Sequence, residues 1–268
     1  MRFHDAFLLR YMRVAPLALA FERSLECRIL RDMSFARPVL DLGCGEGLFA
    51  SMLFSEKIDT GIDPNPRELK RAQHVSAHSE LIQCYGDSVP KPDGAFKTIF
   101  SNSVLEHIDD LQAVLREVYR LLELNGRLYI TVPTNRFDQY TIVSWMLIKA
   151  GMHKLAAGYR RLYNTFWKHF HRHSPDAWEA LMMDHGFRVV ECRTYGSRRV
   201  CMLNVLLVPL AFPAFLVKRL TNRWIAFPRL RSLLARLLLP IARSLLREDE
   251  SCDDGGLLFL ALAKEPSS

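Results

Sequence analysis

Three glycines that follow a short apolar stretch are the first residues of this sequence whose types and spacing suggest chemistry. Gly43, Gly45 and Gly47, in VLDLGCGEGLF, allow the backbone to pass close to a ligand and to open a helix whose amide groups face it. Asp63 lies twenty residues beyond Gly43, at the end of the apolar stretch TGID, where a carboxylate can accept both hydroxyls of a ribose. Asp87 follows a third apolar stretch. A glycine turn and two acids in this order predict a nucleoside-binding site.

Alternating strand and helix patterns supply the elements that must hold these residues. The alternation predicts an α/β fold with a parallel sheet. The carboxyl ends of neighbouring parallel strands share one edge of such a sheet, and open α/β folds bind their ligands there. The expected strands are residues 38–42, 60–64, 81–87, 97–102, 126–133, 187–196 and 255–265, and the main helices are residues 68–78, 111–124 and 174–186.

Charge divides the chain into an acidic body and two basic insertions. The net charge is +7, but residues 139–175 carry six basic residues and residues 192–247 carry eleven, and neither segment contains an acid. The rest of the chain carries 19 basic against 29 acidic residues. We therefore expect a single domain, residues 1–268, in which two insertions interrupt one body. The body consists of an N-terminal helical cap (1–37), a cofactor-binding core (38–138), a helix and sixth strand (174–195) and a last strand (256–264). The insertions are an insertion or lid (139–173) and a basic apolar membrane-associating insertion (196–255).

The stretches VLDLGCGEG, GIDP, GD and SNSVLEHI together closely resemble the class I S-adenosylmethionine-dependent methyltransferases. The resemblance is closest to the group that includes the ubiquinone and menaquinone biosynthesis methyltransferases. It covers about residues 38–133 and returns at residues 173–191 and in the closing strand. It implies a Rossmann-like sheet of seven mostly parallel strands with an antiparallel last strand between strands five and six. Leu48 stands where a dinucleotide fold needs its third glycine, which argues against a pyrophosphate ligand.

The resemblance also implies a role for each polar residue at the sheet edge. Asp41 would orient the glycine turn, and Gly43, Cys44 and Gly45 would line the methionine and ribose part of S-adenosylmethionine. Taken singly, an acid at such a position could equally cap a helix or lie in a solvated loop. The remaining contacts would be Asp63 at the ribose hydroxyls, Asp87 and Ser88 at the adenine, and Ser101 and Asn102 beside the methionine moiety.

Histidines are the candidates for proton transfer during catalysis. A phenol or alcohol acceptor must lose its proton, whereas a carboxylate acceptor need not. The resemblance places His107 near the acceptor, and His169 and His171 lie in HFHRH, where alternate positions of an extended segment share one side. A local structural role stays open for each of them. We expect no metal, because basic residues flank this cluster and no fourth ligand lies near in sequence.

The second insertion has the pattern of a helix that lies in a membrane interface. On a helical wheel of residues 227–247, four arginines fall within about 40° of one another, and six aliphatic residues spread over the opposite side. Alternatively, the aliphatic side packs onto the enzyme's own sheet or onto a second subunit. The arginines are Arg229, Arg236, Arg243 and Arg247, and the aliphatic residues are Leu230, Leu234, Leu237, Leu238, Ile241 and Leu245.

The uncharged residues 200–217 raise the question of a membrane crossing. Eighteen residues barely match the thickness of a hydrocarbon core, and Asn204, Pro209 and Pro213 weaken the run further. A return crossing would have to use residues 224–246 and would bury two arginines at about 2.5 to 3.5 kcal/mol each. We expect a shallow, proline-broken hydrophobic anchor beside the site.

These features predict an enzyme that transfers a methyl group from S-adenosylmethionine to a lipid-like or membrane-borne small molecule, such as a polyprenyl quinone precursor or a lipid-linked saccharide. One alternative is a soluble methyltransferase of a small hydrophobic metabolite, with the insertions as a lid or dimer interface. Another is a non-catalytic S-adenosylmethionine-binding protein. SNSV differs from the N-P-P-Y type motif of base-amine methylases, and the basic zones are rich in leucine, so we expect no nucleic-acid partner. Six cysteines without a C-x-x-C pair favour the cytoplasm, at the inner face of the membrane.

Overall fold

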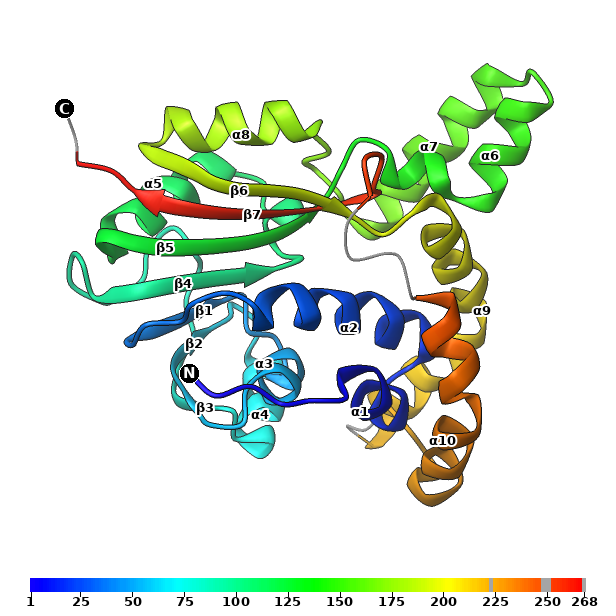
Figure 1. Cartoon of the computed structure of the whole chain (residues 1–268), viewed down its shortest axis with the longest axis horizontal. Helices are drawn as coiled ribbons and strands as arrows, with labels where there is room; N and C mark the ends of the chain where they lie inside the picture. Colours follow the sequence, from blue (N-terminus) through cyan, green and yellow to red (C-terminus); the bar gives the residue numbers. More distant parts are fainter. Residues whose placement is uncertain (222–223, 247–251, 267–268) are drawn as a thin grey trace.

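Seven strands form one mixed sheet in the computed structural model, which describes residues 1–221, 224–246 and 252–266 (Figure 1). The order across the sheet is β3-β2-β1-β4-β5-β7-β6. Neighbouring strands are parallel as far as β5, and β7 runs antiparallel between β5 and β6, which confirms the expected topology. The strands are β1 Val39–Leu42, β2 Ile58–Ile62, β3 His78–Ile82, β4 Phe96–Asn102, β5 Leu122–Pro133, β6 Phe187–Tyr195 and β7 Leu257–Lys264.

The register of the parallel strands brings their carboxyl ends level. Leu42 of β1 pairs with Ile62 of β2, and Ile62 pairs with Ile82 of β3. All four residues of β1 are buried, as expected for a parallel strand that is covered on both faces. The residues that follow these strands therefore meet at one edge of the sheet. We call this the carboxyl edge; it comprises residues 43–47, 63–65, 87–88 and 101–103.

Helices cover both faces of the sheet and bury two apolar clusters. On one face, Phe35, Phe54 and Phe100 pack with their ring centroids 5.0 to 5.9 Å apart, under the N-terminal helices. On the other face, the indole of Trp178 is fully buried. The helices of this body are α1 Phe7–Val14, α2 Leu17–Arg31, α3 Leu48–Leu53, α4 Pro66–Val75, α5 Leu111–Leu121 and α8 Pro175–Asp184, with a short helix η1 at Leu105–His107.

Element boundaries differ from the sequence-based expectation at the third and fifth strands. The third strand, expected over residues 81–87, is β3 at His78–Ile82, because His78 pairs with Ile58 of β2, and the helix expected over residues 68–78 ends at Val75. The helix expected over residues 111–124 ends at Leu121, and β5 starts directly at Leu122. The reason is that Leu122 pairs with Phe96 at the start of β4. This long-range pairing overrides the local helical pattern of the leucines. The start of α8 agrees with expectation, because Ser174 accepts the amide of Ala177 as its N-cap.

Both basic insertions lie at the end of the molecule toward which β4 points, beyond the carboxyl edge (Figure 1). In the second insertion, α9 packs along α2 and α10 packs along α1, so this insertion is held by the N-terminal cap. The first insertion contains the short helix η2 Phe137–Tyr140, α6 Ile142–Lys149 and α7 His153–Trp167, and the second contains α9 Arg198–Thr221 and α10 Pro228–Leu245.

Helix α9, which holds the long uncharged run, is bent. Its halves Arg198–Pro209 and Pro213–Thr221 meet at 61°. Both prolines lack an amide hydrogen, and their rings clash with the preceding turn of a straight helix. In the described part of the chain, no single helix is long and apolar enough to cross a bilayer. The two halves of α9 pass that test of length and composition only as a bent pair.

Candidate functional site

The glycine turn after β1 needs glycine for two different reasons. Gly43 has a φ of +79°, and a Cβ at this position would lie 2.6 Å from the side chain of Val104. Gly45 has a φ of +52°, and a Cβ there would meet no heavy atom of the described residues within 4 Å. The amides of Gly43 and Cys44 anchor the turn by donating to the carbonyl of Ile62, at 2.9 and 2.8 Å. The open space at Gly45 lets a ligand approach the backbone.

Asp63, directly after β2, supports this turn from the neighbouring strand. Its carboxylate accepts the amide of Gly45 at 3.0 Å and the amide of Asn65 at 2.8 Å. Each carboxylate oxygen has a further lone pair, so Asp63 can hold the turn and still accept ligand hydroxyls. Asp87, after β3, is exposed and accepts the hydroxyl of Ser88 at 3.0 Å. The two acids expected from the sequence therefore stand at the ends of neighbouring strands.

Asp41 lies within β1 and supports the sheet below the turn. Its buried carboxylate hydrogen-bonds to Nε2 of His78, at 2.9 Å, and burial raises its pKa. Gly61 of β2 makes room for this pair, since a Cβ there would lie 2.6 Å from the ring of His78. The contact joins β1 to β3, and the charge of Asp41 also acts on Cys44 of the turn, where it helps to raise the pKa of the thiol.

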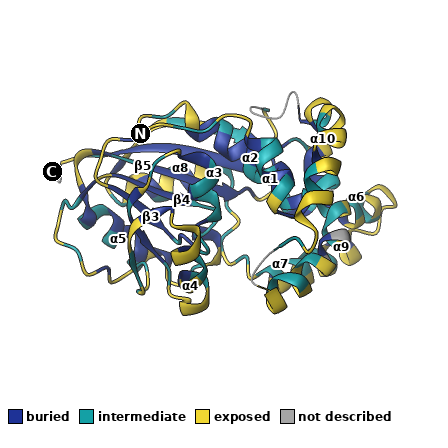
Figure 2. Ribbon diagram, turned by 90° about the horizontal axis from the view of Figure 1, so that it is seen from below, coloured by how far each residue is buried: buried dark blue, intermediate teal, exposed yellow. Residues whose placement is uncertain are grey.

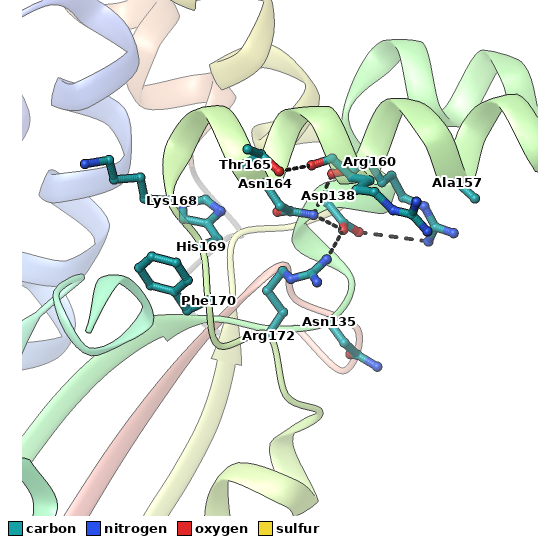
Figure 3. A pocket seen from close by; sticks show the side chains of 11 residues that line it. Asn135, Asp138, Ala157, Arg160, Asn164, Thr165, Lys168, His169, Phe170 and Arg172 are labelled. Atoms are coloured by element: carbon teal, nitrogen blue, oxygen red, sulfur yellow. Dashed lines mark hydrogen bonds and ion pairs between the residues drawn. The ribbon is translucent and has the colours of Figure 1, made fainter. Parts of the chain in front are cut away.

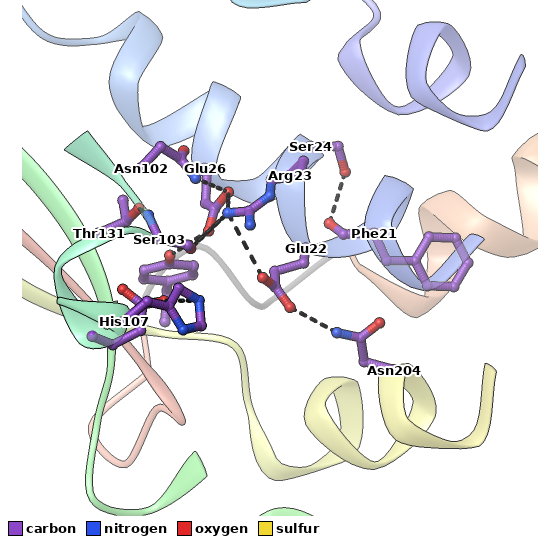
Figure 4. Close-up of polar contacts among 12 residues, drawn as sticks. Phe21, Glu22, Arg23, Ser24, Glu26, Asn102, Ser103, His107, Thr131 and Asn204 are labelled. Carbon is purple, nitrogen blue, oxygen red and sulfur yellow. Dashed lines mark hydrogen bonds and ion pairs between the residues drawn. The ribbon is translucent and has the colours of Figure 1, made fainter. Parts of the chain in front are cut away.

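A buried carboxylate of α2 connects the N-terminal cap to the end of β4 (Figure 4). Glu26 is fully buried, and an arginine one helical turn away supplies its countercharge. Such a charge is tolerated inside a protein only when it is paired and fully hydrogen-bonded. Four side chains donate to Glu26: Arg23 at 2.8 Å, Asn102 at 2.9 Å, Tyr195 at 3.1 Å and Ser103 at 3.2 Å.

Ser101 and Asn102, both predicted cofactor contacts, differ in what they can still bind. Ser101 is buried and donates its hydroxyl to the carbonyl of Leu42 at 3.1 Å, so it holds β4 to β1. Asn102 donates its amide to Glu26, and its Oδ1 is buried without a partner among the described residues. Asn102 therefore offers a free acceptor at the carboxyl edge.

A cavity of about 310 Å³ begins at Ser103, one residue beyond Asn102, and extends into the insertions. We call it the α2–α9 cavity, after two of the helices that line it. Its wall toward α9 is mainly apolar and includes Val208, Ala211 and Phe215. Its polar end is formed by Glu22, Arg23, Ser103, Glu106, His107, His169 and Asn204.

Two glutamates in this cavity hold their protons more tightly than an exposed glutamate does. Burial raises the pKa of Glu22 to about 7, although Arg23 lies 3.8 Å away and Asn204 donates to it at 2.7 Å. Burial also raises the pKa of Glu106 to about 8, and its Oε2 has no partner among the described residues. Near neutral pH both side chains can take up and release a proton, as general acid–base catalysis requires.

His107 and His169 lie together at the polar end of the cavity. Their ring centroids are 5.2 Å apart. Burial lowers the pKa of both, that of His169 to about 4, so both rings are neutral at pH 7. Nδ1 of His107 hydrogen-bonds to the carbonyl of Lys168 at 3.1 Å. Nδ1 of His169 is buried and has no partner among the described residues.

His171 lies outside the α2–α9 cavity, unlike the other two predicted histidines. Its Nε2 hydrogen-bonds to the carbonyl of Ile108 at 2.7 Å, and its ring lies 5.7 Å from that of His173. His173 in turn packs edge-on against Trp178 at 4.9 Å. The HFHRH histidines thus divide between the cavity and the packing of α8. Among the described residues, no group of three or more His, Cys, Asp or Glu side chains could hold a metal ion.

The second insertion contacts the glycine turn directly. Nε1 of Trp224 donates to the carboxylate of Glu46 at 2.6 Å, and Nζ of Lys218 lies 3.1 Å from the same carboxylate. Nζ of Lys218 also lies 4.2 Å from the centroid of the Trp224 ring and 3.6 Å from the carboxylate of Glu68 in α4. Lys218 and Glu46 are mostly buried. The end of α9 therefore covers the carboxyl edge.

The sequence-based prediction omits five polar residues of the site. A signal exists for three of them, because an otherwise apolar helix LALAFERSLECRIL that must pack on the sheet needs buried partners for its charges. The other two give less signal, because an acid beside His107 and an amide inside an uncharged run do not reveal what they face. The five residues are Glu22, Arg23, Glu26, Glu106 and Asn204.

Comparisons with known proteins agree with one another. Residues 14–192 match a family profile described as a methyltransferase domain. Rv0089 of Mycobacterium tuberculosis, named as an uncharacterized methyltransferase, is 30% identical over 115 residues. The match covers 40% of this chain and 58% of that protein, just over half of its length.

Two solved structures share the fold. One is a possible histamine N-methyltransferase from Thermotoga maritima, with a TM-score of 0.57, 15% identity, and coverage of 96% of this chain and 93% of that one. The other is phosphoethanolamine N-methyltransferase 2 of Haemonchus contortus in complex with S-adenosyl-L-methionine, with a TM-score of 0.53, 18% identity, and coverage of 94% and 54%. At these identities the likeness shows the fold alone.

Proposed function

The chain belongs to the methyltransferase-domain family, with S-adenosylmethionine as its cofactor, and from this premise we propose that it methylates a lipid-like acceptor at a membrane surface. Methyl transfer follows from the family. The class of acceptor is our proposal, and it depends on the α2–α9 cavity and on the surface of the second insertion. A quinone precursor or a lipid-linked saccharide belongs to this class.

The residues of the carboxyl edge fit S-adenosylmethionine. Gly45 leaves open space above the turn, and Asp63 keeps lone pairs for the ribose hydroxyls. The unpartnered Oδ1 of Asn102 can accept a hydrogen bond from the amino group of the methionine moiety. When bound, the cofactor supplies an electrophilic methyl group on a positively charged sulfur. The α2–α9 cavity starts beside Asn102 and is therefore the place for the acceptor.

Inside the cavity, the chain's own residues bind the acceptor and manage its proton. The apolar wall from α9 excludes water and packs against the apolar part of the acceptor. Glu22, with a pKa of about 7, accepts the proton of a hydroxyl acceptor, because a base of this strength is partly ionised at neutral pH. The neutral rings of His107 and His169 hydrogen-bond to the acceptor and orient it.

An apolar groove of about 420 Å³ continues the cavity toward α10. The groove shares Pro16, Ala211 and Trp224 with the α2–α9 cavity and is lined further along by aliphatic side chains of α9 and α10. Arg231, the one charged residue among the described residues of its lining, donates to the carbonyls of Met12 and Ala15 and so connects α10 to the cap. A long apolar chain fits the groove while its reactive end reaches the cavity.

The observation that carries the proposal is the exposed apolar side of α10 (Figure 2). Ala235 and Ala242 face the protein and are buried. Arg229, Arg236 and Arg243 are exposed, as in an interfacial helix, whereas Arg247 lies outside the described residues. Leu245 is half-buried, and the exposed fractions lie between 37% and 65% for Leu230, Leu234, Leu237, Leu238 and Ile241. These exposures argue against the alternative that the aliphatic side packs onto the enzyme's own sheet, and they leave open its packing onto a second subunit.

Flotation with vesicles that contain phosphatidylglycerol tests the membrane part of the proposal. The double variant Leu237→Glu/Ile241→Glu places two charges on the exposed side of α10. We expect it to lose at least about tenfold in vesicle affinity, since burying one such side chain contributes about 1.5 to 3 kcal/mol. Leu124→Glu changes a leucine of β5 that is 51% exposed, and this matched control should float like the wild type.

Two results would contradict the membrane part. One is a wild-type protein that does not float at low salt, and the other is an equal loss of binding in the Leu124→Glu control. Light scattering completes this test. A tight dimer whose formation Leu237→Glu/Ile241→Glu prevents would favour a soluble enzyme with α10 in its dimer interface.

Mass spectrometry tests the class of acceptor. Lipid extracts are incubated with the protein and S-adenosylmethionine and are then searched for species that gain one methyl group. The proposal expects a lipid-soluble product that an Asp63→Ala variant does not form. A methylated product confined to the water-soluble fraction would show that the acceptor is not lipid-like.

A further inference from the structure

A second cavity, of about 510 Å³, adjoins the α2–α9 cavity and is strongly basic (Figure 3). It lies beside α7, and His169 lines both cavities, so they meet at that ring. With His169 neutral, the charged side chains of the lining give a net charge of +3. They are one acid, Asp138, and four bases, Arg160, Arg161, Lys168 and Arg172.

Asp138 compensates only part of this positive charge. Its carboxylate lies 3.1 Å from Arg172 and 4.0 Å from Arg160. In the parts of the chain that the structure describes, neither Arg161 nor Lys168 has a carboxylate within 4.0 Å, and both are exposed. Two bases of the basic cavity therefore remain available to an anion.

Four buried polar atoms of the lining side chains also have no hydrogen-bond partner among the described residues. Nε of Arg160 is always a donor, so it needs an acceptor oxygen. Nδ1 of His169 can donate or accept, according to its tautomer. Oδ1 of Asp138 and Oδ1 of Asn164 are acceptors and need donors, which the hydroxyls of a ligand can supply. An anion that also carries hydroxyl groups would satisfy all four atoms.

We propose that the basic cavity binds a phosphorylated sugar or polyol that forms the polar group of the acceptor. Guanidinium groups bind phosphate oxygens with paired hydrogen bonds, and the hydroxyls match the free acceptors. The basic cavity, the α2–α9 cavity and the apolar groove adjoin in this order. In this order they can hold the polar group, the methylated group and the apolar chain of one amphiphile. This inference rests on the proposed function and specifies its substrate.

Calorimetric titration with two phosphate probes tests the basic cavity. The probes are glycerol 3-phosphate and lysophosphatidylglycerol, which carries a glycerol phosphate on a single-chain lipid. Arg161→Gln/Lys168→Gln removes the two uncompensated charges, and we expect it to weaken the binding of both probes by about tenfold or more. Lys149→Gln/Lys154→Gln removes two exposed charges of the same insertion outside the cavity and should change the affinity by less than about twofold.

The outcomes distinguish whether the cavity binds a phosphate group and which kind of molecule supplies it. Tighter binding of lysophosphatidylglycerol would support the cavity as the site of a lipid's polar group. Equal binding would show a site for a soluble polyol phosphate and would overturn its link to the acceptor. No binding of either probe, or an equal loss in the two double variants, would overturn the site itself. Flotation and S-adenosylmethionine titration of the same variants report on the proposed function independently, because neither pair of residues lies at the carboxyl edge or on α10.

Discussion

The carboxyl edge and the α2–α9 cavity are neighbours, but the chain builds them in opposite ways. Every residue of the edge comes from residues 43–103 and either ends a strand of the parallel sheet or lies within six residues beyond one. The residues that line the cavity run from Pro16 to Leu257 in the sequence, and most of them come from α2, η1, η2, α7 and α9. Glu26 of α2 connects the two regions by accepting the amide of Asn102.

The difference indicates how the chain separates cofactor binding from the choice of acceptor. Strand ends are fixed by the hydrogen-bond ladder, so a cofactor site on them keeps its geometry when other parts of the chain change. Inserted helices and loops carry no such constraint, and they are where substrate specificity can vary. We therefore expect substitutions at the edge to affect the binding of cofactor and substitutions in the cavity to affect the choice of acceptor.

The largest expected effect lies where the two regions join. Glu26→Ala breaks the ion pair with Arg23 and removes the acceptor of Asn102, Ser103 and Tyr195, so we expect the free energy of unfolding to fall by about 3 to 5 kcal/mol. Glu123→Ala, at an exposed position of β5, is the control and should change it by less than about 0.5 kcal/mol. Equal denaturation midpoints for the two variants would show that Glu26 does not link the regions.

The next effect concerns the edge alone. Asp63→Ala removes the acceptor of the Gly45 amide together with the proposed acceptor of the ribose hydroxyls. We expect the Kd for S-adenosylmethionine to rise about 100-fold, equivalent to about 2.7 kcal/mol, in a calorimetric titration. Asp87→Ala should raise it only about tenfold, because Asp87 is exposed. The same effect in both variants would argue against the special position of Asp63.

A smaller effect concerns the cavity alone and is measured as the pH dependence of the free energy of unfolding. Burial raises the pKa of Glu106 from 4.5 to about 8, so the folded protein holds this proton more tightly than the unfolded chain. The contribution to stability is complete below pH 4.5 and is lost as the pH rises through about 8. Glu106→Gln should reduce the change in the free energy of unfolding between these pH values by at least about 1.4 kcal/mol, the equivalent of one pKa unit. Parallel stability–pH curves for variant and wild type would contradict the burial of an ionisable Glu106.

The smallest effect tests the contact between α9 and the glycine turn. Lys218→Met removes the ion pair with Glu46, and we expect S-adenosylmethionine to bind about threefold more weakly, a loss of about 0.7 kcal/mol. Arg219→Met changes the next residue of α9, which is exposed, and should bind the cofactor like the wild type. A similar loss in both variants would mean that the insertion influences the edge only through its overall charge.

The fold and the carboxyl edge could be predicted because they depend on local patterns. Gly43, Asp63 and Asp87 each follow an apolar stretch of strand length, and parallel pairing then brings them to one edge. The position of β7 between β5 and β6 came from the resemblance, since residue patterns do not specify which strands pair. The start of β5 at Leu122 was missed because the leucines before it also fit a helix.

The polar end of the cavity could not be predicted in the same way. His169 and His171 belong to one short motif, but the chain turns so that only His169 enters the cavity. Glu22 and Asn204 are 182 positions apart and meet only because α9 packs along α2. Their distance in sequence leaves no periodic signal that could have paired them.

The sequence by itself determined the alternation of strands and helices, the glycine turn, the acids beyond the strand ends and the separation of charge between body and insertions. Each of these depends on the types and spacing of residues within a few tens of positions. Tertiary structure alone decided which buried carboxylates reach the cavity, that their pKa values rise, and that the leucines of α10 remain exposed. The physical reason is that burial and hydrogen bonding at these positions come from segments far apart in the chain, and packing is what brings such segments together.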